Sequence, residues 1–399
     1  TLTCEETRNT GDANGDGYID TGWILEIDPV TKQVKQYGNG IQEKLWAMGR
    51  MQHENAVVAS DKRTVYYGED ATDGCVYKFV ANSAENLSTG TLYVLKLNGG
   101  LSSGEPTSST GSWVQVPNTT KSDRNNTYTL AVSLNATQFN GVEDVEIGPD
   151  GKVYFTAKGN NRVYRFTDNG TTVSNFQTYV GGMSYTINYG SGSVSEAWGS
   201  GNDNLAFDNE GNLWVLQDGS RNHIWVVKNG HTQTSPKVEL FATTPSGSEP
   251  TGITFTPDNK YIFLSFQHPS STNGSQTDAA GRSVSFNNAA TVVIARKENL
   301  GTQGAREGVS EIKEESQLTE FVTLTPNPFE QILTLTLSLD ENKKVKVEVY
   351  DIQGKYLESF DFNGNEGRNT FTFEPSSKGV LIFHIKAGEK SFIKKGISK

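Results

Sequence analysis

The stretch VEDVEIGPDGKVYFTAKGNNRVYRF, residues 142–166, decides the fold. It predicts strands at 142–147, 153–156 and 162–166, because apolar and β-branched residues fill each run. The first two strands are joined by Pro149-Asp150-Gly151, and Asp and Gly tolerate the positive φ of a tight hairpin turn. The stretch therefore predicts a strand–turn–strand–strand unit.

The same unit returns twice, so that the three copies start about 50–60 residues apart. The second copy runs from 203 to 227, and the third runs from 251 to 264 with its last strand at 291–295. A unit repeated at this period is typical of propeller blades. A β-sandwich is the alternative, but it does not explain the repeat.

An acidic residue opens each copy: Glu143, Asp203 and Glu249. The first strand of a propeller blade is the innermost one, so we expect these three side chains to face one central channel. Carboxylates that return to strand ends either hold cations or make solvated turns. The cation interpretation predicts chemistry performed on metals.

Composition supports an all-β protein and limits its partners. The 399 residues can form two domains, and 41 glycines with 34% hydrophobic residues fit many short strands joined by polar turns. The net charge of -11 argues against nucleic acid, and it fits either cation binding or plain solubility. No apolar run reaches the ~18 residues of a spanning helix, so we expect no membrane span. We also expect a monomer.

The N-terminal residues carry two further indications. Cys4 lies beside Glu5 and Glu6, and a thiol next to carboxylates suits a transition metal better than calcium alone. The two cysteines, Cys4 and Cys75, leave open a disulfide, a metal ligand or a buried thiol. The chain starts at Thr1 within a predicted strand, without an initiator Met or a signal peptide, so we expect an N-terminally truncated fragment.

The chain is predicted to have two domains. Residues 1–298 are predicted to be β throughout, and the polar, glycine-containing segment 299–320 is predicted to be a linker. Residues 321–399 alternate apolar and polar positions, as in Val345–Val349, which is typical of half-buried sandwich strands.

The C-terminal domain resembles the type IX secretion sorting domain of Bacteroidota. The resemblance rests on four segments in order: Pro326–Phe329, Val347–Lys355, Lys378–Leu381 and Lys394-Lys395. It implies recognition by secretion machinery and export across the outer membrane to a secreted or surface location. A generic carbohydrate-binding or immunoglobulin-like sandwich is the alternative.

Residues 1–298 resemble the PhoX-type alkaline phosphatases. The segments that carry this resemblance are Leu2–Glu6, Gly22–Pro29, Gly49–Glu54, Tyr66–Asp70, Tyr77–Val80, Gly141–Asp144, Asp203-Asn204 and Gln267–Pro269. The resemblance implies a six-bladed β-propeller that uses calcium and iron. The predicted fold is therefore an N-terminally truncated six-bladed propeller followed by a small β-sandwich.

The resemblance also implies the site. It assigns Cys4 and Glu5 to iron, and it implies that other carboxylates hold iron or calcium: Glu54, Glu143, Asp203, Asp218 and Glu249. Glu249 and Arg50 are the implied catalytic residues, although Arg50 could equally form a structural salt bridge. His53 could be a core histidine and Asp218 part of a turn. The family tends to carry a basic residue just before the glutamate matched by Glu249, where this chain has Gly247-Ser248.

A separate calcium motif is DANGDGYID, residues 12–20. It matches the first nine positions of an EF-hand loop, but position twelve is Trp23 and not a bidentate Glu. Asp12, Asn14, Asp16 and Asp20 therefore predict either a loop calcium site or a plain Asn/Asp/Gly turn.

Together these observations predict a secreted, metal-dependent phosphatase that hydrolyses phosphate monoesters of small molecules. Clustered cations can neutralise a phosphoryl group and activate an oxygen nucleophile. Two alternatives remain: a non-catalytic calcium-binding propeller that binds a surface partner, and a lactonase-type propeller hydrolase.

Overall fold

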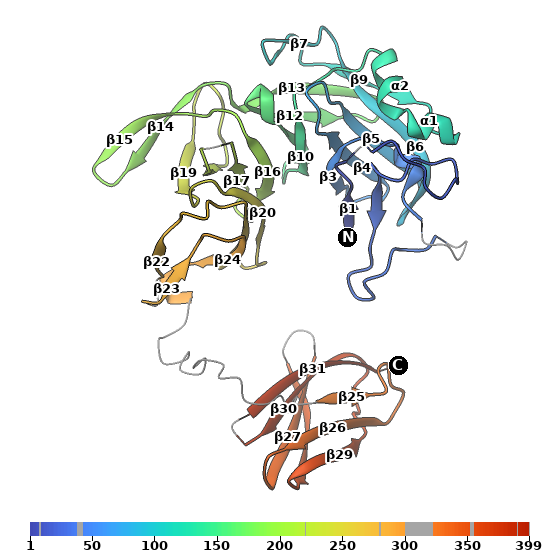
Figure 1. Cartoon of the computed structure of the whole chain (residues 1–399), viewed down its shortest axis with the longest axis vertical. Helices are drawn as coiled ribbons and strands as arrows, with labels where there is room; N and C mark the ends of the chain where they lie inside the picture. Colours follow the sequence, from blue (N-terminus) through green and yellow to red (C-terminus); the bar gives the residue numbers. More distant parts are fainter. Residues whose placement is uncertain are drawn as a thin grey trace. The chain divides into compact units, whose positions relative to one another are not determined.

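In a computed structural model, the chain divides into two compact units, Thr1–Ala305 and Arg306–Lys399 (Figure 1). The structure describes residues 1–7, 9–37, 43–219, 221–278, 281–299, 322–351, 355–388 and 390–398. Strands dominate both units, which confirms the predicted all-β fold. The predicted linker at 299–320 lies, except for Asn299, outside the described residues, so the domain boundaries stay a prediction.

The first unit consists of antiparallel sheets that follow one another along the chain. Their strands are β1 (Leu2–Cys4) and β2 (Ile24–Glu26); β3 (His53–Val58), β4 (Thr64–Glu69), β5 (Val76–Ser83) and β6 (Asn86–Leu97); β10 (Val142–Ile147), β11 (Val153–Ala157), β12 (Arg162–Asp168) and β13 (Thr172–Gly181); β16 (Asn202–Phe207), β17 (Leu213–Gln217), β18 (His223–Val227) and β19 (Val238–Thr243); and β20 (Glu249–Phe255), β21 (Tyr261–Gln267) and β24 (Ala290–Ala295).

The first strands of these sheets lie next to one another. β1 contacts β3, β3 contacts β10, β10 contacts β16 and β16 contacts β20 (Figure 1). Each sheet then runs outward strand by strand, which is the arrangement of propeller blades. The propeller-like fold is as predicted, and its predicted number of six blades stays a prediction.

The β3–β6 and β10–β13 sheets are joined into one sheet of nine strands by β9 (Gly111–Val116), which pairs with β6 on one side and β13 on the other. The apolar faces of neighbouring sheets pack against one another. Strands that alternate apolar and polar residues give each sheet one apolar face, and that face needs a neighbouring sheet to cover it. Tyr66, Phe155 and Phe176 belong to one such cluster, and Trp198 and Trp225 stack in the next.

One stretch between β9 and β10 departs from the expectation of strands throughout 1–298. Residues 121–133 form two short helices, α1 (Lys121–Asn125) and α2 (Thr127–Ser133). A capping box explains the first, since the Thr120 hydroxyl accepts from the Asp123 N–H and the Asp123 carboxylate accepts from the Thr120 N–H. A hairpin of β14 (Ser184–Tyr189) and β15 (Gly192–Ala197) keeps to the expectation of strands and extends away from the sheets in Figure 1.

The remaining short elements of this unit lie in the connections. They are η1 (Trp46–Met48), β7 (Leu101–Ser102), β8 (Glu105–Pro106), η2 (Lys158–Asn160), β22 (Ser275–Thr277), β23 (Ser283–Ser285) and η3 (Lys297–Asn299). Among the helices that the structure describes, none combines the length and apolarity that crossing a bilayer requires.

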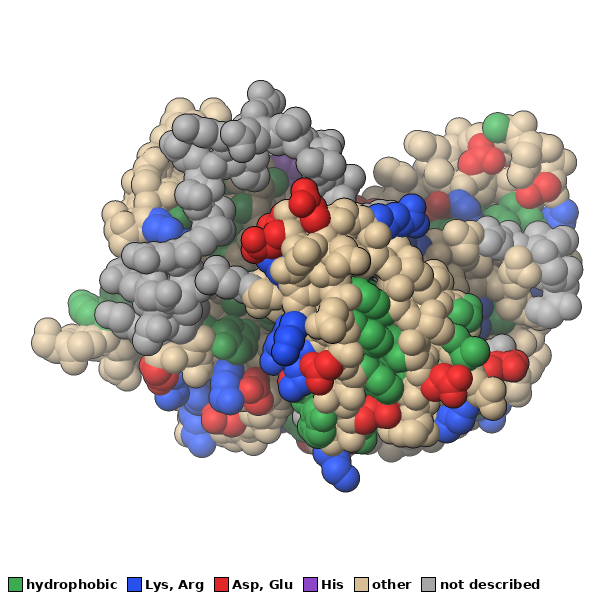
Figure 2. Space-filling view, turned by 90° about the horizontal axis from the view of Figure 1, so that it is seen from below, with side chains coloured by type: hydrophobic (Ala, Val, Ile, Leu, Met, Phe, Trp, Pro, Cys, Tyr) green, Lys and Arg blue, Asp and Glu red, His purple; other side chains and the backbone are tan. Residues whose placement is uncertain are grey.

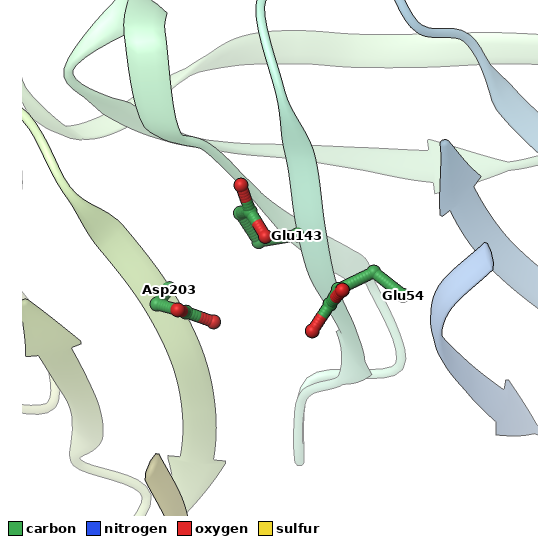
Figure 3. A group of neighbouring side chains, drawn as sticks. All are labelled: Glu54, Glu143 and Asp203. Atoms are coloured by element: carbon green, nitrogen blue, oxygen red, sulfur yellow. The ribbon is translucent and has the colours of Figure 1, made fainter. Parts of the chain in front are cut away.

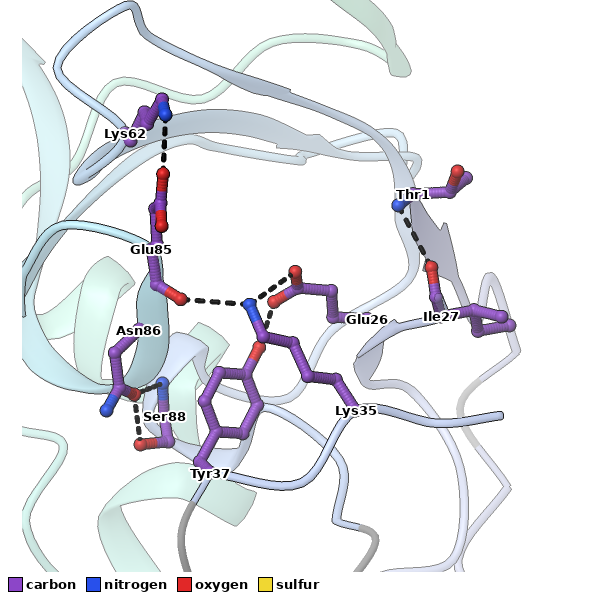
Figure 4. Close-up of polar contacts among 9 residues, drawn as sticks. All are labelled: Thr1, Glu26, Ile27, Lys35, Tyr37, Lys62, Glu85, Asn86 and Ser88. Atoms are coloured by element: carbon purple, nitrogen blue, oxygen red, sulfur yellow. Dashed lines mark hydrogen bonds and ion pairs between the residues drawn. The ribbon is translucent and has the colours of Figure 1, made fainter. Parts of the chain in front are cut away.

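Polar contacts fix the N-terminal strand pair β1–β2 to the rest of the unit (Figure 4). The Thr1 amino group donates to the Ile27 carbonyl at 3.0 Å. Lys35 Nζ donates to the Glu26 carboxylate and to the Glu85 carbonyl, each at 2.9 Å, and Tyr37 donates to Glu26. These bonds hold the strand that ends at Cys4.

The second unit is a sandwich of two antiparallel sheets, as predicted. One sheet contains β25 (Thr323–Thr325), β26 (Leu333–Leu339) and β29 (Gly367–Phe373); the other contains β28 (Tyr356–Gly364), β27 (Lys343–Tyr350), β30 (Gly379–Ala387) and β31 (Lys390–Ser398). Leu335 from one sheet and Val347 and Phe383 from the other share one apolar core.

On the face shown in Figure 2, acidic and basic side chains are interspersed and neither sign forms a continuous patch.

Candidate metal centre

Three innermost strands carry a β-bulge at the same place, near their first residue. In each bulge two residues oppose a single residue of the next strand, so the strand bends and its side chains are re-aimed. The bulged pairs are Glu54-Asn55 in β3, Glu143-Asp144 in β10 and Asp203-Asn204 in β16. The first member of each pair is a carboxylate, and the second is Asn or Asp.

The first members of these pairs converge. One carboxylate oxygen each from Glu54, Glu143 and Asp203 lies within 4.8 Å of the others, and Figure 3 shows the three side chains pointing toward a common space. Glu143 and Asp203 are 2% and 4% exposed, and Glu54 is half-buried. These three predicted ligands therefore lie together at the innermost strands, away from the outer rim.

Asp203 belongs to a second group, together with Asp218 and Glu249, again with oxygens within 4.8 Å. Asp218 follows the last residue of β17, and Glu249 is the first residue of β20. The bulge of β20 comes later, at Gly252-Ile253. Glu249 thus reaches the group from a different strand position than Glu143 and Asp203, whereas Glu54 is their structural equivalent.

The second members of the bulged pairs bond neighbouring sheets to one another. The Asp144 carboxylate accepts from Asn55 Nδ2 of β3 and, at 2.6 Å, from the Leu205 N–H of β16. The side-chain amide oxygen Oδ1 of Asn204 accepts from the Gly252 N–H of β20 at 2.8 Å. These bonds run between innermost strands, so they fix the carboxylates beside them.

The surroundings of Glu54, Glu143 and Asp203 raise their pKa values and so disfavour the ionised form of these three carboxylates. Burial, with the charge of Asp203, raises the pKa of Glu54 to about 8 and that of Glu143 to about 9. Burial, with the charges of Asp218 and Glu249, raises the pKa of Asp203 to about 7, against the lowering effect of Lys158. A cation bound among these oxygens would remove this repulsion.

The donor set fits calcium. Calcium takes hard oxygen ligands at ~2.3–2.6 Å, so oxygens within 4.8 Å of one another can share one ion. Among the described residues, the thiol of Cys4, the softer donor that iron would use, belongs to neither group of ligand atoms within 4.8 Å of one another. Burial raises its pKa to about 12, and the nearby charges of Glu54 and Asp144 add to that effect. Both cysteines are free thiols, and Cys75 is buried in the core.

Other predicted site residues have partners of their own. Glu5 Oε1 lies 2.6 Å from Lys44 Nζ, and its Oε2 accepts from the Trp23 N–H at 3.1 Å. The Arg50 guanidinium is buried and donates to the carbonyls of Asn9 and Thr21. His53 is fully buried and its Nε2 contacts the Gly49 carbonyl at 3.0 Å, which matches the interpretation as a core histidine.

The loop at 12–20 is folded by its own side chains. The Asp12 carboxylate accepts from the Gly17 N–H at 3.0 Å, and that of Asp16 accepts from the Tyr18 N–H at 2.7 Å. The Asn14 side chain accepts from the Asp16 N–H, and Asp20 accepts from the Ala13 N–H. These contacts form the turn that was the alternative, and calcium binding here stays a prediction.

Sequence reasoning missed Lys158 and the role of Asp144. Lys158 Nζ lies 2.9 Å from Glu143 Oε1 and 3.7 Å from Asp218 Oδ2. A signal for Asp144 was available, because Asn55, Asp144 and Asn204 each follow a carboxylate directly. Nothing in the sequence around Lys158 distinguishes it from a solvated lysine.

The raised carboxyl pKa values predict how the cation-free protein responds to pH. Between about pH 4 and pH 9 the unfolded chain has released protons that Glu54, Glu143 and Asp203 retain when folded, so stability falls as pH rises. Thermal unfolding in EDTA should show a lower Tm at pH 8 than at pH 5. Millimolar calcium should raise the Tm at pH 8 by about 5–10 °C, the shift expected at ~100 times Kd. A Tm in EDTA that does not change between these pH values would contradict this prediction.

Comparison with known proteins gives two family matches. The model described as alkaline phosphatase PhoX matches residues 1–270, and the model described as secretion system C-terminal sorting domain matches residues 323–399. A search of curated sequences finds no match.

Three of the solved structures that match the chain resemble it only weakly. A protein described as the extracellular domain of a hybrid two-component system from B. thetaiotaomicron is 12% identical with a TM-score of 0.35; the alignment covers 95% of this chain and 48% of that one. A catalytically inactive virginiamycin B lyase from Staphylococcus aureus with quinupristin is 12% identical, at a TM-score of 0.33, with 100% and 99% covered. A protein described as a 6-phosphogluconolactonase from Bacteroides uniformis is 10% identical, at 0.36, with 93% and 98% covered. Structural similarities this weak give no information about the activity of the chain.

Proposed function

Because the chain belongs to the alkaline phosphatase PhoX family, we propose that it hydrolyses phosphate monoesters of small molecules at a cluster of calcium and iron ions. The observation that supports this most is the convergence of five carboxylates in two groups that share Asp203. Cations bound there would neutralise the phosphoryl charge and activate an oxygen nucleophile.

In this proposal Glu143, Asp203, Asp218 and Glu249 hold calcium, and Glu54 is shared between calcium and iron. Asp203 has the central role because its carboxylate belongs to both groups. Cys4 is proposed as the iron ligand, since the charge of Glu54 already acts on its thiol. The roles of Glu5 in iron binding, and of Arg50 and Glu249 in catalysis, are proposed on the resemblance.

Asp144 and Asn204 would act as positioning residues. Each bonds a backbone N–H of the next innermost strand, so each fixes the carboxylate that precedes it. Partners of metal ligands that orient them in this way typically change metal affinity by 10–100-fold when removed.

The chain also carries its export signal. The secretion system sorting domain at 323–399 indicates export across the outer membrane to a secreted or surface location. Extracellular calcium modules bind calcium with Kd values of ~10⁻⁴–10⁻³ M, and calcium outside cells is plentiful enough to fill sites of this affinity. A surface location therefore suits a calcium-dependent site.

The proposal is tested by elemental analysis of the purified full chain together with an assay on p-nitrophenyl phosphate. We expect iron, more than one calcium per chain, and phosphate release that stops when EDTA removes the cations. Calcium without iron and without phosphate release would favour the non-catalytic propeller, and hydrolysis of a lactone in place of the phosphate ester would favour a lactonase.

A further inference from the structure

Lys158 is a cation within the acidic cluster. Its ammonium lies 2.9 Å from Glu143 Oε1 and 3.7 Å from Asp218 Oδ2. In the part of the chain that the structure describes, no other Lys or Arg nitrogen lies within 4.0 Å of the carboxylates of the two groups. A lysine in this place lowers the number of carboxylates available to cations, so its presence needs an explanation.

The strand register shows that Lys158 occupies a repeated position. In three sheets the second strand ends opposite the residue that precedes the bulged pair: Glu69 opposite His53, Ala157 opposite Val142, and Gln217 opposite Asn202. The residues that follow these strand ends are Asp70, Lys158 and Asp218. Two sheets thus place an aspartate at this position, and the sheet between them places a lysine.

The burial of Lys158 differs from that of its partner. Its side chain is 34% exposed, whereas the side chain of Glu143 is 2% exposed, so the ion pair joins a partly exposed lysine to a buried carboxylate. An ammonium has three donors on a flexible stem, which allows it to bind two groups at once. Cations on Glu143 and Asp218 would compete with the ammonium for the same oxygens, and the ammonium would then be available to an anion arriving from solvent.

We propose that Lys158 anchors the substrate, its ammonium binding a non-bridging oxygen of the phosphate group while the carboxylates hold cations. This inference rests on the proposed function, because it places the phosphate beside Glu143 and Asp203. A lysine binds phosphate as a point charge and needs no fixed planar geometry. A counter-ion that only neutralises Glu143 is the competing explanation.

The test compares binding of inorganic phosphate by calorimetry to the metal-loaded full chain and to Lys158→Met. Phosphate affinity should fall roughly 10- to 100-fold, as expected for the loss of one charge-assisted hydrogen bond. Cation content by elemental analysis should be unchanged, and Lys158→Arg should restore most of the affinity. Lys152→Met, at the turn of the same hairpin, is the matched control and should bind phosphate like the wild type.

Three results would overturn the assignment: wild-type affinity in Lys158→Met, a loss of phosphate binding that follows a loss of cations, or no phosphate binding by the wild type. Kinetics separate this inference from the proposed function. If the wild type hydrolyses p-nitrophenyl phosphate and Lys158→Met leaves KM unchanged, only the role of Lys158 is wrong. If the wild type binds phosphate through Lys158 but hydrolyses no ester, only the proposed function is wrong.

Discussion

Asp203→Asn is expected to lower phosphatase activity by on the order of 10³-fold, more than the 10–100-fold typical of residues that only orient a ligand. The reason is that Asp203 belongs to both carboxylate groups, so its loss would remove a ligand from both of the proposed cation sites. Elemental analysis should show fewer calcium ions per chain.

Thermal unfolding gives this prediction a second readout. In EDTA at pH 8, Asp203→Asn should be more stable than the wild type, because it removes a charge repelled by Asp218 and Glu249. In calcium the order should reverse. Glu239→Gln, on the exposed outer strand of the same sheet, is the control and should change neither activity nor stability. Full activity and cation content in Asp203→Asn would refute its central role.

Cys4→Ser is expected to remove iron, and with it the visible absorption of the protein, while calcium and the fold remain. Cys4 is the last residue of β1, held by main-chain pairing with β2 that does not depend on its side chain. Burial raises the pKa of its thiol to about 12, so iron binding must displace a proton that the cation-free protein holds at neutral pH.

Cys75→Ala is the matched control, because Cys75 is a buried free thiol of the core. This variant should lose stability through its cavity and retain iron. Iron retained at full occupancy in Cys4→Ser would show that the metal has other ligands. Mass spectrometry of the alkylated protein that finds Cys4 joined to Cys75 would also exclude Cys4 as the iron ligand.

Much of the fold could be predicted from local pattern. The strands around 142–166 and their two later copies lie where alternation and turn residues placed them, because each turn must supply positive φ and each strand must bury one face. The copy that starts at β3 was not recognised as a repeat. The helices at 121–133 were not predicted. The Thr and Asp residues that form the capping box at the start of the first helix also favour turns, so the sequence pattern does not distinguish a helix start from a turn here.

The site was predictable in part, for a reason that lies in the bulges. Period-two alternation tells which residues of a strand share a face, but an inserted residue breaks that period. Glu143 and Asp144 are neighbours in a strand, yet one joins the acidic group and the other bonds the next strand. Lys158 could not be found, since its position at a strand end becomes meaningful only beside Asp70 and Asp218.

The bonds between innermost strands have a consequence for how the proposed metal centre would take up ions. Asp144 and Asn204 hold the neighbouring carboxylates by contacts to backbone N–H groups, and these contacts are made by the chain itself without an ion as a partner. The centre is therefore preorganised: loading requires little rearrangement of the chain, and less of the binding free energy is lost to ordering. Because the same bonds fix the carboxylates in place, these groups cannot move apart to reduce their mutual repulsion. The repulsion can then be relieved either by binding protons or by binding cations. Ion occupancy should then follow the acidity of the surroundings, with protons acting as competitors for the same oxygens.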